Sequence, residues 1–346
     1  MTIEFEPIEV RDDTGPVLDV RDLRVWYAGA KAPVQAVDGV SFALRPGEVL
    51  GLVGESGCGK STLGRGLLGL LPRGAAVDGE LHFQGRDLLG LSTRERESVR
   101  GAGMGLIFQE PMTRLDPLMR VSAHFNEVLK VHEPDLSKAQ RRTRALEALR
   151  ALGIPPTRYR SYPHEFSGGM RQRIMIALTL ALRPRFIVAD EPTTALDVLV
   201  EAQILRILAD IRDQYSPAIL LITHNLGIVA EACDRVAVMY AGRIVEQGPV
   251  REIFAEPKHP YTQELMRSVI SLHTRELHSI PGAPPDLGDP PPGCRFHPRC
   301  PHAMQICPTK VPPAIDNTEC WLLDRTLSPA DSAPLAREEV SIADEA

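Results

Sequence analysis

The sequence predicts an α/β fold in which strands of a parallel sheet end at a phosphate-binding site. One observation is an apolar strand pattern at 48–53 that runs into a glycine-rich loop and then into a leucine-bearing helix at 62–71. Another is a pair of later apolar segments, 185–191 and 218–223, which end in two carboxylates and lead into a histidine. Parallel α/β sheets bind ligands at the carboxyl ends of their strands, so functional side chains are expected there.

The glycine-rich loop matches the pattern G-x-x-x-x-G-K-S/T in full over Gly54–Ser61. Glycines let such a loop fold around phosphate with its backbone N–H groups pointing inward. Lys60 is expected to reach the β- and γ-phosphates, and the Ser61 hydroxyl to ligate Mg²⁺. Cys58 is interpreted as a small loop residue and not as a nucleophile. The nucleotide-binding residues predicted here are Gly54, Ser56, Gly57, Cys58, Gly59, Lys60, Ser61 and Thr62.

Polar side chains that follow other strands predict hydrolysis as well as binding. Asp190 is placed to hold the Mg²⁺ shell, and Glu191 to orient or deprotonate an attacking water. His224 is predicted to contact the γ-phosphate. Gln109 follows the apolar run 104–108 and is expected within reach of both metal and water. The predicted catalytic group is therefore Lys60, Gln109, Glu191 and His224, and the predicted Mg²⁺ ligands are Ser61, Gln109 and Asp190.

A second candidate anion site is Ser167-Gly168-Gly169, which precedes a helix predicted over 170–182. Free N–H groups at a helix start attract anions, although such a triplet is also a common plain helix cap. Lys60 and Asp190 are far apart for a minimal phosphate-loop domain. The sequence between them is patterned mainly as helix, so we expect an inserted helical subdomain at about 95–180 that ends in the second site. The helices predicted in it span 93–100, 122–131, 137–152 and 170–182, the third with a cap at Ser137–Gln140.

Taken in order, these blocks resemble an ATP-binding-cassette (ABC) ATPase over about residues 18–250. Phosphate loop, Q-loop Gln109, signature Ser167-Gly168-Gly169, acidic strand end, D-loop Asp197 and H-loop His224 follow in the family's sequence. The resemblance implies a RecA-like core, an N-terminal antiparallel β-subdomain and the helical insert. The sequences of these motifs are similar to those of the D-type subunit of the peptide/nickel importer family, although Phe166 and Met170 depart from the general ABC signature. Three stretches carry that likeness: 167–173, 189–198 and 238–246.

What the resemblance implies is a pair of cassettes clamping two ATP molecules head to tail, each signature serving its neighbour's nucleotide. Tyr27 would stack on adenine, with Trp26 as the competing candidate. The implied partners are a second cassette of the F-type, two transmembrane permease subunits and an extracytoplasmic solute-binding protein. The segment 110–117 resembles the one that meets the pore subunit. Peptide is the favoured cargo, with nickel or oligosaccharide as alternatives.

Composition limits the remaining classes of function. The net charge is −6, with 39 Lys and Arg against 45 Asp and Glu, so no basic footprint for nucleic acid is present. No apolar run approaches the ~18–20 residues that cross a bilayer. The chain is therefore expected to sit peripherally on the cytoplasmic face of the inner membrane. A non-transport ABC ATPase is the alternative, but the tandem cassettes or long coiled coils typical of that class are absent from the sequence.

The C-terminal part, 255–325, is rich in proline and holds four of the six cysteines. The cysteines are spaced C-x5-C-x6-C-x12-C, unlike the short knuckles of structural zinc sites. Four thiolates can hold an iron–sulfur cluster, and the resemblance implies a 4Fe-4S cluster here. Zinc, with His297 and His302 nearby, and free structural thiols stay open. The predicted ligands are Cys294, Cys300, Cys307 and Cys320. The expected division is a tail at 1–16, the ATP-binding domain at 17–254, this extension at 255–325, and disorder at 326–346.

Overall fold

The computed structural model describes residues 15–29, 32–101, 103–108, 115–193, 198–268 and 279–335. Its larger sheet has the strand order β11-β12-β10-β9-β3-β8-β7-β6. The strands β3, β9, β8, β7 and β6 run parallel, whereas β10, β12 and β11 add antiparallel strands at one edge. The bounds are β3 Val49–Val53, β6 Met104–Ile107, β7 Phe186–Asp190, β8 Ala218–Ile222, β9 Arg235–Tyr240, β10 Arg243–Pro249, β11 Ala314–Ile315 and β12 Thr318–Glu319.

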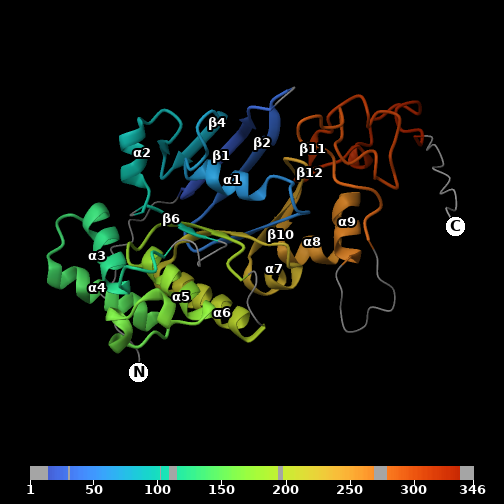
Figure 1. Cartoon of the computed structure of the whole chain (residues 1–346). Helices are drawn as coiled ribbons and strands as arrows, with labels where there is room; N and C mark the ends of the chain where they lie inside the picture. The colour runs from blue at the N-terminus through green and yellow to red at the C-terminus, as the bar shows by residue number, and fades with distance from the viewer. Residues whose placement is uncertain are drawn as a thin grey trace, which may run out of the picture.

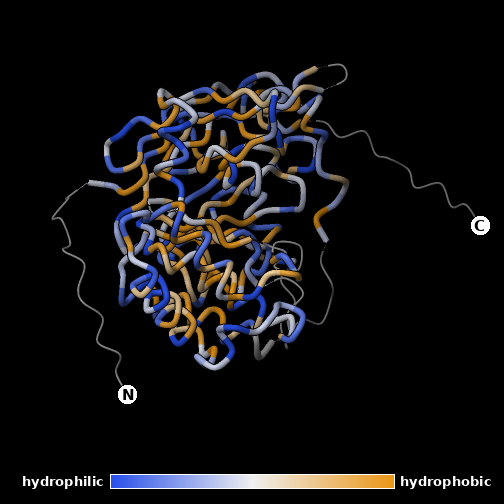
Figure 2. The backbone as a smooth tube through the Cα atoms, turned by 60° about the vertical axis from the view of Figure 1, so that its left-hand side comes forward, coloured by the Kyte–Doolittle hydropathy of each residue, from blue (hydrophilic) through white to orange (hydrophobic). Residues whose placement is uncertain are grey.

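The central strands are apolar throughout because both faces of the sheet are covered. Every residue of β3, β7 and β8 is buried, as expected for parallel strands between two layers. Successive residues enter opposite cores: Ile187 packs with the helices on one face, and Val188 packs on the other. Figure 2 shows the hydrophobic residues gathered in the interior and the hydrophilic ones mainly on outer loops.

A smaller antiparallel sheet, ordered β2-β1-β4-β5, covers one face. Figure 1 shows it above helix α1, with the larger sheet below α1 and helices α5, α6 and α7 on the far side. Leu23 and Val25 of β1 share one core with Leu63 and Leu67 of α1, which ties the layers together. The bounds are β1 Leu18–Tyr27, β2 Val34–Leu44, β4 Ala76–Phe83, β5 Arg86–Asp87 and α1 Lys60–Leu67.

A compact helical group lies between β6 and β7 in the chain, at the lower left of Figure 1. It consists of α3 Val121–His132, α4 Lys138–Ala151 and α5 Gly168–Leu180. Helix α4 begins with a capping box in which Ser137 accepts from the Gln140 N–H and the Gln140 side chain accepts from the Ser137 N–H, as predicted. Helix α2 Thr93–Val99 lies instead beside the antiparallel sheet, against which Val99 packs. The helical group proper therefore starts later than residue 95.

The remaining helices come between or after strands of the larger sheet in the chain. Helix α6 spans Val198–Tyr215, α7 spans Leu226–Ala232, α8 spans Val250–Ala255 and α9 spans Pro260–Arg267. Short 3-10 turns occur at Pro156–Arg160, Pro163–Glu165 and Trp321–Leu323. Within the described residues no helix has both the length and the apolarity to cross a membrane.

The C-terminal extension consists mainly of turns and packs against the larger sheet beside β2 and β10 (Figure 1). Its β12 pairs with β10 through Glu246 and Thr318. Phe296 packs edge-on against Tyr240 of β9 and Tyr261 of α9, with ring centroids 5.1 and 5.4 Å apart. Aromatic packing therefore ties the extension to the sheet.

The expectation of disorder from residue 326 is wrong for the part that is described. Residues 326–335 fold back over the extension: Gln305 and Leu335 donate their N–H groups to the carbonyls of Ala333 and Ala303 at 2.9 Å. These backbone bonds order a segment with no apolar periodicity, which is why its composition gave no signal. Residues 1–14 and 336–346 lie outside the described residues.

Candidate nucleotide site

The phosphate loop connects β3 to α1, and its glycines are required by close backbone approaches. Gly54 has φ +153°, and a Cβ there would lie 2.0 Å from the Met239 carbonyl oxygen. Gly59 has φ +107°, and a Cβ there would lie 2.1 Å from the Ala36 carbonyl oxygen. A side chain would therefore be obstructed at both positions whatever its chemistry.

Lys60 is buried and reaches back into its own loop. Its Nζ donates to the carbonyls of Gly54 at 2.7 Å and Glu55 at 2.9 Å. An ammonium held this close to the loop backbone stands where a phosphate cradled by the loop would meet it. Burial raises the pKa of the neighbouring Cys58 thiol despite the charge of Lys60, so this cysteine is a neutral packing residue, as interpreted from sequence.

Ser61 and Asp190 meet although 129 residues separate them. The Ser61 hydroxyl donates to the Asp190 Oδ1 at 2.9 Å. Burial raises the pKa of Asp190, which is 6% exposed at the end of β7. A hydroxyl and a buried carboxylate side by side are the oxygen donors that Mg²⁺ prefers.

Glu191 and His224 form a second pair at the same edge of the sheet. The His224 Nδ1 lies 2.9 Å from both Glu191 carboxylate oxygens. The Glu191 side chain is 14% exposed and that of His224 is 66% exposed, so the imidazole faces open space while the carboxylate is sheltered. Glu191 adopts φ +51° and donates its N–H to the Ile222 carbonyl of β8. An uncommon backbone conformation is thus maintained where the two strand ends meet.

Tyr27, at the end of β1, points toward the start of α1. Its hydroxyl lies 3.3 Å from the Thr62 hydroxyl. Tyr27 and Trp26 both line an open pocket of about 720 Å³, together with Gln35 and residues 288–290 of the extension. The structure thus places both candidate aromatic residues at one pocket, and Tyr27 also contacts the first turn of α1.

Ser167 is the N-cap of α5, and its hydroxyl accepts from the Met170 N–H. The helix begins at Gly168, two residues earlier than predicted, because the cap itself is Ser167. From the same helix the buried Gln172 side chain donates to the Pro192 carbonyl at 2.9 Å. Gln172 therefore links the signature helix to the segment after Glu191, a contact that no local sequence pattern indicates. The predicted Gln109 and Asp197 lie outside the described residues.

The four cysteines of the extension do not support a metal centre. In the described part of the chain, which includes all four, no group of three or more His, Cys, Asp or Glu could hold a metal ion. Burial raises the pKa of Cys294 and of Cys320 to about 12, so both are neutral thiols in this structure. The predictions of a 4Fe-4S cluster and of zinc are therefore not supported. Cys294 and Cys307 pack with Met304 and Ile306, and Cys300 packs in the cluster that holds Tyr240 and Phe296.

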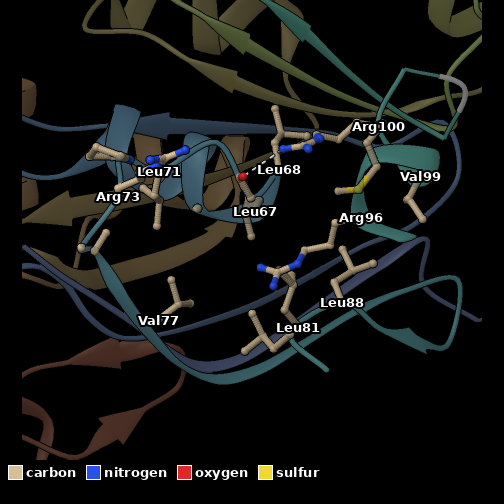
Figure 3. Close-up of a pocket in the computed structure, with 17 residues that line it drawn as sticks. Leu67, Leu68, Leu71, Arg73, Val77, Leu81, Leu88, Arg96, Val99 and Arg100 are labelled. Atoms are coloured by element: carbon tan, nitrogen blue, oxygen red, sulfur yellow. Dashed lines mark hydrogen bonds between the residues drawn. The ribbon is translucent and has the colours of Figure 1, made fainter. Parts of the chain in front are cut away.

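Cavities in the described part of the chain also occur away from the residues of the phosphate loop. Figure 3 shows one of about 220 Å³ between α1, β4 and α2, in which Arg100 donates to the Gly69 carbonyl at 3.0 Å. None of the predicted site residues lines it. Another, about 410 Å³, is a groove between the helical group and the end of α1, lined mainly by apolar side chains. Phe108, Leu115, His124 and Met175 line this groove.

The chain is similar to known proteins over most of its length. Residues 37–194 match the ABC transporter family, and residues 245–307 match the oligopeptide/dipeptide transporter C-terminal region. The oligopeptide transport ATP-binding protein OppD of Salmonella typhimurium is 48% identical over 86% of this chain and 89% of its own length. The dipeptide transport ATP-binding protein DppD of Bacillus subtilis is 46% identical over 89% of this chain and 95% of its own length.

Solved structures show the same fold. A dimeric ATP-binding cassette in a post-hydrolysis state, bound to ADP and Pi, superimposes with a TM-score of 0.61 at 25% identity. It covers 68% of this chain and 99% of its own. The cbiO1 subunit of a Clostridium perfringens ABC transporter complex gives a TM-score of 0.60 at 29% identity, over 70% of this chain and 91% of its own. The chain therefore belongs to the ATPase subunits of ABC transporters, in the branch that carries the oligopeptide/dipeptide transporter C-terminal region.

Proposed function

We propose that this chain binds Mg-ATP at the phosphate loop and hydrolyses it to drive the import of peptides. The observation that carries the proposal is the convergence of the Ser61–Asp190 and Glu191–His224 pairs at one edge of the sheet, next to Lys60. Ser61 and Asp190 would hold Mg²⁺, and Lys60 would exchange the loop carbonyls for phosphate oxygens. Peptide as cargo follows from the relatives, which are named as oligopeptide and dipeptide transport proteins.

In this proposal Glu191 is the general base and His224 orients it. The sheltered Glu191 carboxylate accepts a proton from the attacking water while the imidazole fixes its direction. Mg²⁺ supplies charge neutralisation at the phosphates. Gln109 and Asp197 are proposed to complete the site from the loops after β6 and β7. Tyr27 is proposed to stack on adenine, because its hydroxyl fixes the ring beside Thr62.

Glu191→Gln tests this assignment. We expect a loss of roughly 10²–10³-fold in ATPase turnover with nucleotide binding retained, because the amide cannot accept the proton. The matched control is Glu231→Gln, a change at an exposed carboxylate, which should turn over normally. Unchanged turnover in Glu191→Gln would remove Glu191 from the role of base.

A partner cassette is proposed because the Ser167 signature caps an exposed helix start and one solved neighbour is described as a dimer. ATP would then favour the closed pair, and hydrolysis would release it. Glu191→Gln should trap that pair. If the chain alone dimerises with ATP in size-exclusion chromatography, the partner is a second copy. If it dimerises only after addition of a sister subunit, the F-type partner is the correct one.

The apolar groove beside α1 is the proposed contact for a transmembrane permease subunit. It is lined by Leu115, within the predicted contact segment 110–117, of which residues 110–114 lie outside the described residues. Leu118, three residues on, is 86% exposed. Leu118→Asp should lower peptide uptake in cells while leaving ATPase of the isolated chain unchanged. Val131→Asp, at another exposed apolar position, is the control and should leave uptake normal.

Uptake assays in a deletion strain decide the cargo. Complementation with this chain should restore uptake of a labelled peptide. Restoration of nickel or oligosaccharide uptake instead would shift the assignment to another branch of the same importers. Membrane fractionation supplies the other arm: a chain that stays in the soluble fraction and never co-purifies with permease subunits would favour the non-transport alternative. We also propose that the chain associates with the cytoplasmic face of the membrane. The complete transporter is proposed to include an extracytoplasmic binding protein.

A further inference from the structure

Two arginines of the C-terminal extension lie in the segment between Cys294 and Cys300. Arg299 contacts the phosphate loop, and Arg295 contacts a turn that is hydrogen-bonded to it. Arg299 makes a two-pronged ion pair with Glu55, the second residue of the loop. Its Nη1 donates to Oε2 at 2.7 Å and its Nη2 to Oε1 at 3.0 Å. Such bidentate pairs fix direction as well as distance.

Contacts other than the ion pair with Glu55 also hold the Arg299 guanidinium in place. Its side chain is 6% exposed. The Nε donates to the Pro281 carbonyl at 2.8 Å, Nη1 also lies 3.2 Å from the Tyr240 hydroxyl, and Nη2 also donates to the Ile280 carbonyl. Burial on its own would lower the pKa of Arg299, but the hydrogen bonds to Glu55 and Tyr240 raise it above its usual value. The cation is therefore permanent and aimed at the loop.

Glu55 transmits this position to the rest of the loop through its backbone. Its N–H donates to the Tyr261 hydroxyl at 2.9 Å, and its carbonyl accepts from Lys60 at 2.9 Å and from the Cys58 N–H at 3.3 Å. The extension and α9 thus hold both the side chain and the N–H of the residue that positions the Lys60 ammonium. A shift of Glu55 would move the group proposed to meet the phosphates.

Arg295 supports the other end of the loop. It donates to the carbonyl of Ala241 and, at 2.7 Å, to the carboxylate of Asp38. The next residue in that turn, Gly242, donates its N–H to the Cys58 carbonyl at 2.8 Å. One short segment of the extension therefore contacts Glu55 directly through Arg299 and supports Cys58 indirectly, through Arg295 and the Ala241–Gly242 turn.

Electrostatics gives Arg299 a second task. Glu55 carries a negative charge within the loop that is proposed to receive a triphosphate, and like charges at short range repel. The Arg299 guanidinium neutralises that charge through its two-pronged ion pair with Glu55. Without it, Glu55 would both lose its position and oppose the incoming phosphates.

We propose that Arg299 is a positioning residue that, through Glu55, orients the phosphate loop for a nucleoside triphosphate, so that the extension sets the affinity for ATP. This inference rests on the proposed function and adds a role for the extension within it. Conformational changes in the extension would then reach the nucleotide through Arg299 and Glu55, a path of two side chains.

The test is Arg299→Met in the full-length chain, assayed for ATPase with its partner cassette. We expect the KM for ATP to rise about tenfold, the equivalent of one charge-assisted hydrogen bond, with kcat changed less than about twofold. Arg299→Lys should recover part of the affinity, because it keeps the charge but not the fork. Arg325→Met, at an exposed arginine of the same extension, is the matched control and should behave as the unmodified protein.

The double variant Arg299→Met with Glu55→Gln separates positioning from plain structural support. If repulsion by an unpaired Glu55 is the cause, the double variant regains most of the lost affinity and of any loss in the thermal midpoint measured without nucleotide. An unchanged KM in Arg299→Met overturns the inference. So does a fall in the thermal midpoint with no change in KM.

Tyr261→Phe keeps the inference testable if Arg299→Met does not fold. It removes only the hydroxyl that accepts from the Glu55 N–H and should raise the KM by a few-fold; an unchanged KM counts against the inference. Lys60→Ala distinguishes failure of the proposed ATPase function from failure of the proposed role of Arg299. Normal ATPase in Lys60→Ala would refute the proposed function itself, whereas lost ATPase there with normal KM in Arg299→Met would refute only the role of the extension.

Discussion

His259 should make the protein acid-sensitive. It is 1% exposed at the start of α9, where its Nδ1 accepts from the Tyr261 N–H at 3.0 Å. Its Nε2 has no hydrogen-bond partner among the described residues. The nearby Glu246 carboxylate accepts from the backbone N–H groups of Lys258 and His259 and not from the imidazole. Burial lowers the pKa of His259 from 6.5 to about 3.

The coupling between protonation of His259 and folding sets the direction and the size of the change in stability with pH. Between pH 6.5 and 3 the unfolded chain binds a proton at this site and the folded chain does not, so stability falls as the pH falls. The full difference of about 3.5 pKa units corresponds to roughly 5 kcal/mol. Most of the loss lies below pH 6, and the share between pH 7 and pH 5 is about 2 kcal/mol. That is a large part of the stability of an ordinary domain.

His259→Asn is the perturbation to measure. Asparagine can keep the helix cap, because its side-chain oxygen can accept the Tyr261 N–H. The free energy of unfolding of both proteins is measured by urea titration at pH 7 and pH 5, followed by tryptophan fluorescence. The variant is expected to be less stable at pH 7, because a small cavity is left, yet to lose about 2 kcal/mol less on acidification. His302→Asn, at an exposed histidine, should keep the normal pH dependence. An equal loss in His259→Asn and in the unmodified protein would refute the reasoning.

Other outcomes follow from the same structure. Gly59→Ala should weaken ATP binding at least roughly 100-fold in calorimetry, because the methyl would meet the Ala36 carbonyl at 2.1 Å and φ is +107°; normal affinity would contradict the loop geometry. Cys58→Ser should keep more than about half of the ATPase rate, since burial raises the pKa of that thiol; a tenfold loss would give Cys58 a chemical role. Iodoacetamide should alkylate Cys294 and Cys320 slowly in the native protein and rapidly in urea, because burial raises both pKa values to about 12; fast native labelling, read by mass spectrometry, would oppose this.

Local signals explain what could be predicted from the sequence. The strand at Val49–Val53 and the capped helix at Lys138–Ala151 follow from apolar runs, glycine positions and a capping box, all readable within a few residues. The meeting of Ser61 with Asp190 was predictable because a phosphate loop and an acidic strand end have a fixed relation in this sheet.

Long-range pairing explains what could not be predicted. Arg299 and Glu55 lie 244 residues apart, and neither has a neighbour in sequence that indicates the other. The metal prediction rested on the number of cysteines and the composition around them. Their burial depends on how the turns of the extension pack, which the sequence pattern does not show. Residues 326–335 lack an apolar pattern and are ordered by backbone bonds to 303–306, which no composition reveals.

The position of β12 in the larger sheet bears on how readily the chain associates with itself in solution. Strand β10 would otherwise present an unpaired row of N–H and C=O groups, and such an edge recruits strands from other molecules. The two-residue strand β12 pairs with β10 at Glu246 and Thr318, and the equally short β11 follows it, so this edge offers little backbone for another strand to pair with. A chain cut after residue 254 would keep every part of the phosphate loop and still be prone to aggregate. We therefore expect the extension to limit self-association, although it holds none of the proposed catalytic side chains.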